Sequence, residues 1–122
     1  MNNKNNKLKI VDPEKSLQII KEIERNPQIT QRHLSQKLEI SLGKINFLIN
    51  SLIDKGIIEA KNFKNSKNKL AYMYLLTPKG IKTKIRLTQE FFIWKMQEYR
   101  RLKQEIERLK KESSFSLLQS SK

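Results

Sequence analysis

The sequence predicts a mainly α-helical fold with one small β-hairpin (α+β), in which three short helices, the hairpin and a long C-terminal helix follow one another. Apolar residues recur at helical spacing over residues 12–56 and alternate with polar residues over residues 57–76. Helical spacing then resumes and continues without a break until Ser113. A chain of 122 residues can hold one small domain and an appendage.

The charge balance points to a polyanionic partner. Lys and Arg number 26 against 12 Asp and Glu, which gives a formal net charge of +14. The absence of cysteine excludes disulfides and thiolate metal sites and fits a reducing compartment. The longest apolar run, residues 71–76, is far too short to span a bilayer, and no apolar segment of a secretory signal follows the first lysines. We therefore expect a soluble, cytoplasmic protein without a membrane partner.

The first two helices are predicted from their start signals. Residues 1–11 are rich in Asn and Lys and are expected to form a disordered tail. Asp12, followed by proline and glutamate, predicts a helix start, and the apolar stripe of this helix ends near Arg25. After a proline break, Thr30 is the predicted cap of a second short helix, residues 31–39.

The third helix is bounded by Ser41, a predicted cap, and Gly56, a predicted stop. Its inner arc holds leucine and isoleucine, whereas its outer face holds a glycine, two asparagines and a phenylalanine, which are poor choices for a helix exposed to water. Such a face suits DNA, because glycine lets the backbone approach a phosphate and the side chains can contact base edges. The alternative is an ordinary packed helix with a solvated outer face. The predicted recognition-helix contacts are Gly43, Lys44, Asn46, Phe47 and Asn50.

Two short helices joined by a tight turn, the second with an apolar inner face and a polar outer face, are typical of a helix-turn-helix. In that geometry the start of the first helix faces the DNA backbone. Gln31 and Arg32 are therefore predicted phosphate contacts, together with Ser41 at the start of the next helix. The only histidine, His33, lies on a helix surface and is assigned no role.

Two strands are predicted at residues 57–63 and 70–76, with a polar turn between them. A hairpin directly after a helix-turn-helix is a wing. Between residues 60 and 89 there are eight basic residues and no acidic one, so we predict that the wing tracks DNA phosphates. A solvated basic loop is the alternative. The predicted wing contacts are Lys61, Lys64, Asn65, Lys67 and Lys69.

The last helix is predicted at residues 78–112 and is too long for so small a domain to bury. The winged helix-turn-helix domain is accordingly placed at residues 12–77, and a second disordered tail at residues 113–122. Apolar residues of the long helix recur in heptads, which predicts a coiled coil that joins two copies of the chain. The predicted dimerisation residues are Ile85, Phe92, Tyr99, Leu102, Ile106 and Leu109.

These apolar dimerisation residues form the predicted seam between two helices. The charges beside the seam favour a parallel pair of helices. With Tyr99 at heptad position a, Glu98 faces Lys103 of a parallel partner, and Glu105 faces Lys110. An antiparallel pair would set like charges against each other. The alternative to a dimer is a single helix stabilised by its own ion pairs along one face.

No catalytic arrangement is expected. The chain has one histidine and three isolated glycines, so neither a catalytic triad nor a phosphate-binding loop can be assembled, and no metal site or cofactor is predicted. Its carboxylates lie beside lysines and arginines on predicted helix surfaces. The sequence therefore favours a binding protein over an enzyme.

Two stretches of the chain match a known pattern: ITQRHLSQKLEISLGKINFLINSLIDKGIIEAKNF and KNSKNKLAYMYLLTPKGI. Through them, from about Glu14 to Glu112, the chain resembles the MarR-type winged-helix transcriptional regulators, most closely a small subgroup associated with exopolysaccharide gene clusters. The resemblance implies a homodimer whose helix at Leu42–Asp54 enters the major groove while the wing at Phe63–Lys69 reaches a flanking groove. Larger MarR proteins dimerise through long helices at both ends of the chain and often bind a small aromatic ligand beside that interface. No N-terminal dimerisation helix is predicted here, so no small-molecule effector is expected.

The sequence thus predicts a sequence-specific regulator of transcription that binds double-stranded DNA as a homodimer. Two other functions stay open. The first is a protein-interaction adaptor that uses the winged domain and the coiled coil without specific DNA binding. The second is binding of RNA or single strands through Tyr72 and Tyr74 on the predicted sheet.

Overall fold

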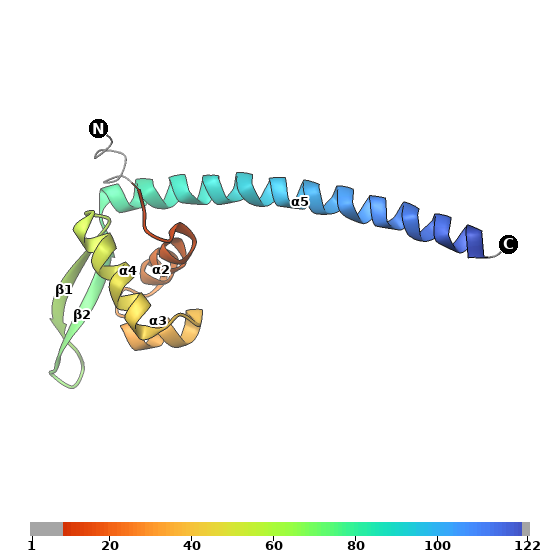
Figure 1. Cartoon of the computed structure of the whole chain (residues 1–122). Coiled ribbons are helices and arrows are strands. Elements are labelled where there is room, and N and C mark those ends of the chain that lie inside the picture. Colours follow the sequence, from red (N-terminus) through yellow and green to blue (C-terminus); the bar gives the residue numbers. More distant parts are fainter. Residues whose placement is uncertain (1–8, 121–122) are drawn as a thin grey trace. The chain divides into compact units, whose positions relative to one another are not determined.

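The structure is a computed structural model that describes residues 9–120. Its contacts divide it into two units, the first ending at Thr88 and the second beginning at Gln89, and the last helix contributes to both. The mainly α fold with a hairpin after three helices is confirmed (Figure 1). In chain order the elements are α2 (Pro13–Arg25), α3 (Gln31–Leu38), α4 (Leu42–Asp54), β1 (Ile58–Lys64), β2 (Leu70–Leu76) and α5 (Pro78–Ser120).

The core of the first unit lies where the apolar faces of α2, α3 and α4 meet. Leucine and isoleucine at helical spacing turn inward on all three helices, and the chain on either side of them adds further buried aliphatic side chains. Burying each such side chain stabilises the fold by about 1.5 to 3 kcal/mol. This core fixes the outer face of α4. Its fully buried members include Ile19, Ile20, Ile23, Leu34, Ile45, Leu48, Ile49, Leu52, Ile57, Ile58 and Leu87.

The helix caps predicted at Thr30 and Ser41 both form. Thr30 Oγ1 accepts a hydrogen bond from the backbone N–H of His33 at 3.0 Å, and Ser41 Oγ accepts one from Lys44 at 3.2 Å. Asp12 precedes α2 as predicted, but its backbone is left-handed (φ 45°) and its side chain makes no capping bond. Its carboxylate instead lies 3.3 Å from the ammonium of Lys44, so tertiary pairing replaces the local cap.

The hairpin is antiparallel, with Ile58 opposite Leu76 at its base and Lys64 opposite Leu70 at its tip. The backbone N–H of Tyr74 donates to the carbonyl oxygen of Pro27 at 2.9 Å, which ties β2 to the loop between α2 and α3. Because of this bond, the strand that carries the wing has a fixed position relative to the helix-turn-helix.

The turn at the wing tip is held by the side chain of Asn65. Its Oδ1 accepts hydrogen bonds from the backbone N–H groups of Lys67, at 2.9 Å, and Lys69, at 3.1 Å. Asn68, within the same turn, has a left-handed backbone with φ 60°. These bonds give Asn65 a structural part in the wing in addition to the DNA contact predicted from the sequence.

The start of α5 is locked to the end of α4. Thr77 Oγ1 accepts a hydrogen bond from the backbone N–H of Gly80 at 3.0 Å and donates to the carbonyl oxygen of Gly56 at 2.5 Å. A Cβ atom at Gly80 would lie 2.1 Å from the carbonyl oxygen of Ile57. Only glycine therefore lets the helix begin this close to the first strand.

The boundaries of the predicted tails differ from the observed elements. The helix α5 continues to Ser120, because residues 113–120 contain neither proline nor glycine and serine costs a helix only a few tenths of a kcal/mol. At the other end Ile10 is buried, and Ser16 Oγ donates to the carbonyl oxygen of Val11 at 2.6 Å. The rest of the predicted tails, residues 1–8 and 121–122, lies outside the described residues.

Candidate nucleic-acid interface

The outer face of α4 is open to solvent, as the sequence predicted. Gly43, Asn46, Phe47 and Asn50 are exposed, and the Phe47 ring keeps 54% of its surface accessible. A Cβ atom at Gly43 would meet no other atom within 4 Å, so no packing requires a glycine there. This helix therefore carries an exposed aromatic ring and an unneeded glycine on a face whose opposite side forms the core.

The two asparagines of this face belong to a chain of hydrogen bonds. Asn50 Nδ2 donates to Asn46 Oδ1 at 3.2 Å, and Asn46 Nδ2 donates to Gln31 Oε1 at 3.2 Å. Gln31 Nε2 in turn donates to the hydroxyl oxygen of Tyr74 at 3.1 Å. The chain thus runs from the exposed face of α4 through α3 to a tyrosine of β2 that is only 4% exposed.

Gln31 therefore has a different environment from the one the sequence suggested. It was predicted as a phosphate contact, yet both ends of its amide are engaged inside the protein. Tyr74, which completes the chain of bonds, was not recognised as part of the site. The two residues are 43 positions apart in the sequence, and no local pattern connects a tyrosine on a strand with a glutamine at a helix start.

The other predicted contacts near the helix-turn-helix are placed as follows. Arg32 is exposed in the first turn of α3 and forms no ion pair with any acidic residue of the described part of the chain. The hydroxyl of Ser41 is exposed but is used as the cap of α4. Arg32 is thus available to a phosphate, and Ser41 chiefly sets where α4 begins.

Lys44 lies between an acid and an aromatic ring. Its ammonium is 3.3 Å from Asp12 Oδ2 and 5.9 Å from the centre of the Phe47 ring. Asp12 is also 4.0 Å from the ammonium of Lys15. No local pattern indicates that Asp12, which precedes α2, would reach the first turn of α4. Its negative charge repels a phosphate.

The lysines of the wing are open to a partner. Lys61, Lys64, Lys67 and Lys69 are all exposed, and none of them forms an ion pair with an acid within residues 9–120. Lys61 lies on β1, Lys64 ends that strand, and Lys67 and Lys69 lie in the turn, so the lysines follow the hairpin from the strand to its tip. Such an arrangement suits the regularly spaced phosphates of a nucleic-acid backbone.

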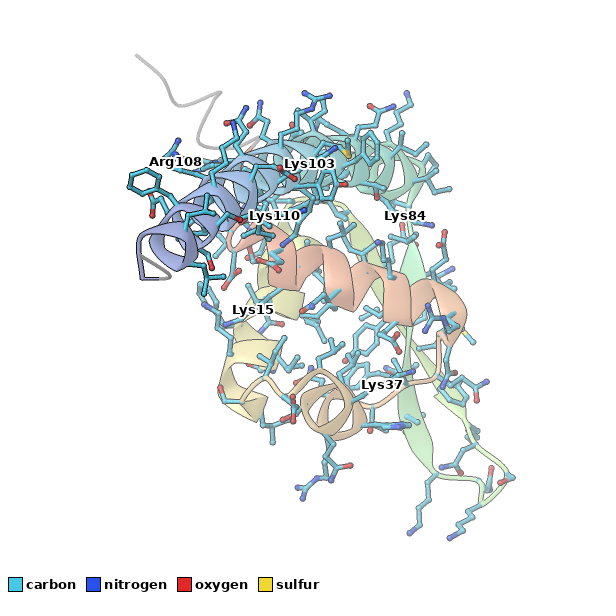
Figure 2. The ribbon with its side chains drawn as sticks, turned by 90° about the vertical axis from the view of Figure 1, so that its right-hand side faces the viewer. Lys15, Lys37, Lys84, Lys103, Arg108 and Lys110 are labelled. Carbon is cyan, nitrogen blue, oxygen red and sulfur yellow. The ribbon has the colours of Figure 1, made fainter. Side chains whose placement is uncertain are left out.

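Other basic residues of this unit are engaged within the protein. Lys37 of α3 lies beside α2, with its ammonium 2.6 Å from Glu22 Oε2, and Lys84 of α5 pairs with Glu24 (Figure 2). Lys79 donates to the carbonyl oxygen of Lys55 at 2.7 Å. The fold therefore separates the basic residues into those that pair with groups of the protein itself and those that remain open to a partner molecule.

Glu22 joins α2 to α3 from a buried position. Besides Lys37, its carboxylate contacts Arg25 at 2.9 Å. The hydrogen bond from Lys37 holds the pKa of Glu22 below its ordinary value, and this effect outweighs the burial that would raise it. The lowered pKa favours the charged carboxylate, which joins α2 to α3 through its ion pair with Lys37.

In the second unit the predicted seam residues form an exposed row. Tyr99, Leu102, Ile106 and Leu109 each keep more than half of their surface accessible. Glu98 pairs with Lys95 of the same helix at 3.4 Å, whereas Glu105 pairs with no basic side chain in the described residues. Of the other two predicted seam residues, Phe92 is also exposed here, and Ile85 is exposed in the first unit.

Within residues 9–120, no helix is both long and apolar enough to cross a bilayer. In the same part of the chain, no three His, Asp or Glu side chains are grouped so that they could hold a metal ion.

A helix-turn-helix followed directly by a two-stranded wing defines a winged helix-turn-helix DNA-binding domain. Residues 13–59 of this chain match the family described as winged helix-turn-helix DNA-binding. The match covers α2, α3, α4 and the start of β1.

One similar solved structure is described as a "possible transcriptional regulator" from Methanosarcina mazei Go1. It is 18% identical in sequence, covers 70% of this chain and 74% of its own, and superposes with a TM-score of 0.43. No curated protein matches the chain.

Proposed function

We propose that this protein is a sequence-specific transcriptional regulator that binds double-stranded DNA as a homodimer. The observation that carries the proposal is the outer face of α4, where two amides and an aromatic ring are exposed in one row opposite the core. An amide can pair with an adenine edge, and an apolar ring can contact a thymine methyl group. The match of residues 13–59 to a DNA-binding family supports the same conclusion.

In this proposal, selectivity and affinity come from different parts of the first unit. Asn46, Phe47 and Asn50 contact base edges in the major groove. Lys44 can reach a phosphate or a guanine. Arg32 and the wing lysines contact phosphates, which adds affinity without distinguishing sequences. The exposed wing lysines support this division of roles. They form no ion pair with an acid of the described residues, so binding a phosphate breaks no such pair.

We propose that the second half of α5 forms the dimer interface. The row formed by Tyr99, Leu102, Ile106 and Leu109 is apolar, exposed and repeated in heptads, and a second copy of the same row would cover it. In a parallel pair Glu105, which has no partner within the described chain, faces Lys110 of the other copy. Two domains joined in this way would occupy half-sites about 34 Å apart.

The resemblance to MarR-type regulators, from about Glu14 to Glu112, supports the finer assignment to that family and to the regulation of exopolysaccharide genes. We propose no catalytic activity and no small-molecule effector, and we place the protein in the cytoplasm. The rival function is an adaptor that holds protein partners through the winged domain and the coiled coil. An adaptor would bind DNA weakly and without preference among sequences.

Selection of bound fragments from the source genome, or from random duplexes, tests DNA recognition. We expect enrichment of an inverted repeat, and competition by duplex but not by single-stranded DNA. Replacing Asn50 with alanine should lower the preference for that site by about 1 to 3 kcal/mol. Gln36→Ala, on the exposed face of α3, is the control and should leave the preference unchanged. Enrichment of no sequence would favour the adaptor.

Sedimentation equilibrium tests the dimer. Ile106→Lys places a charge in the apolar row and should yield monomers, whereas Gln104→Lys adds the same charge outside the heptad seam and should not. Orientation is tested with two charge variants, one carrying Glu98→Lys and Glu105→Lys, the other carrying these changes together with Lys103→Glu and Lys110→Glu. In a parallel pair the first variant sets lysine against lysine and weakens the dimer, and the second restores opposite charges and the dimer. In an antiparallel pair like charges face each other in the unaltered chain and in both variants, so an unchanged dimer affinity would contradict parallel pairing.

A further inference from the structure

We infer that Gln31 and Tyr74 are positioning residues for DNA recognition: through hydrogen bonds they set which polar atoms Asn46 and Asn50 present to the bases. The inference rests on the proposed function, because it concerns how the same face of α4 distinguishes sequences. It adds two residues that make no contact with a base.

The first step is the direction of the hydrogen bonds. A side-chain amide has an oxygen that accepts and a nitrogen that donates, and turning it by 180° exchanges the two. Asn50 donates to Asn46, Asn46 donates to Gln31, and Gln31 donates to Tyr74. Turning one amide would break its bonds unless the others turned as well, so the bonds couple the orientations of the three amides.

The second step is what remains available at the exposed end. Asn50 uses one N–H in this series and keeps its Oδ1 and its other N–H free of any partner among the described residues. One acceptor beside one donor is the pair of groups that binds adenine through N6 and N7 in the major groove. Asn46 has its Oδ1 engaged by Asn50, so its capacity to accept from a base is reduced.

The third step is the anchor at the buried end. The Tyr74 ring is 4% exposed, and the backbone N–H of the same residue bonds to Pro27, so the hydroxyl has a fixed position. A mobile asparagine on a helix surface samples several rotamers, and ordering it on binding costs conformational entropy. The bonded series orders Asn46 and Asn50 before DNA arrives, which favours the one base whose edge matches them.

The strand also offers a matched control. Tyr72 stacks on Tyr74 with ring centres 6.5 Å apart, but it is 62% exposed, and its hydroxyl has no hydrogen-bond partner in the described residues. Tyr74→Phe removes one hydroxyl from the series, and Tyr72→Phe removes one hydroxyl beside it. Gln31→Met and Gln36→Met form a second pair, because both lie on α3 and only Gln31 belongs to the series.

The experiment measures the affinity of the full-length chain for its selected site and for every single-base variant of that site. We expect Tyr74→Phe and Gln31→Met to lower the preference for adenine at one position of each half-site by about three- to tenfold, the worth of about one hydrogen bond. Preferences at the other positions, affinity for unrelated duplexes and the salt dependence should stay the same. Tyr72→Phe and Gln36→Met should match the unaltered chain, and thermal unfolding checks that each variant folds.

The outcomes separate the inference from the proposed function. If the unaltered chain prefers no sequence, both fail. If it prefers a sequence and Tyr74→Phe behaves like Tyr72→Phe, only the positioning role is overturned. A uniform loss of affinity for all duplexes in Tyr74→Phe, with Gln31→Met unaffected, would also overturn it, because that result describes damage to the fold.

Discussion

The ammonium of Lys44 lies 3.3 Å from the carboxylate of Asp12, so an acid is held against the first turn of α4. This acid lies beside a lysine that we assign to DNA. Its charge competes with a phosphate for the same ammonium group. The pair therefore opposes binding to any polyanion, whatever its base sequence.

Replacing Asp12 with asparagine should raise affinity for specific and unrelated duplexes alike by about two- to fivefold, the range of an exposed ion pair. Asparagine tolerates the left-handed backbone of this position, so the fold should persist. Fluorescence anisotropy at several salt concentrations is the measurement. Asp54→Asn, at the far end of α4, is the control, and an equal gain there would show that only net charge matters.

Replacing Gly43 with alanine should stabilise the free protein by about 1 kcal/mol, because an exposed helical position gains a better helix former and the added Cβ meets nothing. DNA affinity should nevertheless fall by about two- to tenfold, since the backbone could no longer approach a phosphate as closely. Urea unfolding tests the predicted gain in stability, and a binding titration tests the predicted loss of DNA affinity. Unchanged affinity would show that Gly43 does not approach DNA closely.

Replacing Gly80 with alanine should have the opposite effect on stability. The added Cβ would lie 2.1 Å from the backbone carbonyl of Ile57, which cannot move aside as a side chain could. We expect a loss of about 3 kcal/mol in the free energy of unfolding. Gly43→Ala is the matched control, because both changes add one methyl group near the first turn of a helix. A small effect at Gly80 would mean that α5 can begin differently.

The lowered pKa of Glu22 predicts that the stability of the fold falls at acidic pH. Because the pKa of this carboxyl is lower in the folded protein than its ordinary value of 4.5, its stabilisation is complete above pH 4.5 and is lost as the pH falls through the folded-state pKa. Glu22→Gln should lower the free energy of unfolding at pH 7 by about 1 kcal/mol. The difference from the unaltered chain should shrink steadily below pH 4.5.

Urea unfolding at a series of pH values gives this comparison. Glu14→Gln serves as the control. It removes an exposed carboxylate from the same helix, and Glu14 itself forms no ion pair within the described residues. A difference in the free energy of unfolding between the Glu22 variant and the unaltered chain that stayed constant as the pH fell would contradict the lowered pKa.

Replacing Lys64 and Lys67 together with alanine should weaken binding to every duplex alike and reduce the slope of log affinity against log salt by about 2, one unit for each lost phosphate contact. The ratio between specific and unrelated sequences should stay constant. The double variant Lys21→Ala, Lys111→Ala removes the same charge away from the wing and should leave the slope unchanged. A changed ratio in the wing variant would assign base recognition to the hairpin.

The sequence by itself determined the order and type of the elements and which side of α4 faces outward. Helical spacing of leucine and isoleucine placed the core, and alternation placed the strands, because each pattern is local and follows the geometry of the backbone. The outward position of Phe47 and Asn50 followed from the same spacing. The wing lysines were recognised because they lie together in the sequence.

Tertiary structure decided which polar groups meet. Gln31 and Tyr74, or Asp12 and Lys44, come together only once α3, β2 and the start of α2 are packed around α4. Their pairing depends on distances across the core, which no local pattern records. For the same reason, the fold alone divides the lysines into those that hold the protein together, such as Lys37, and those left open to a partner.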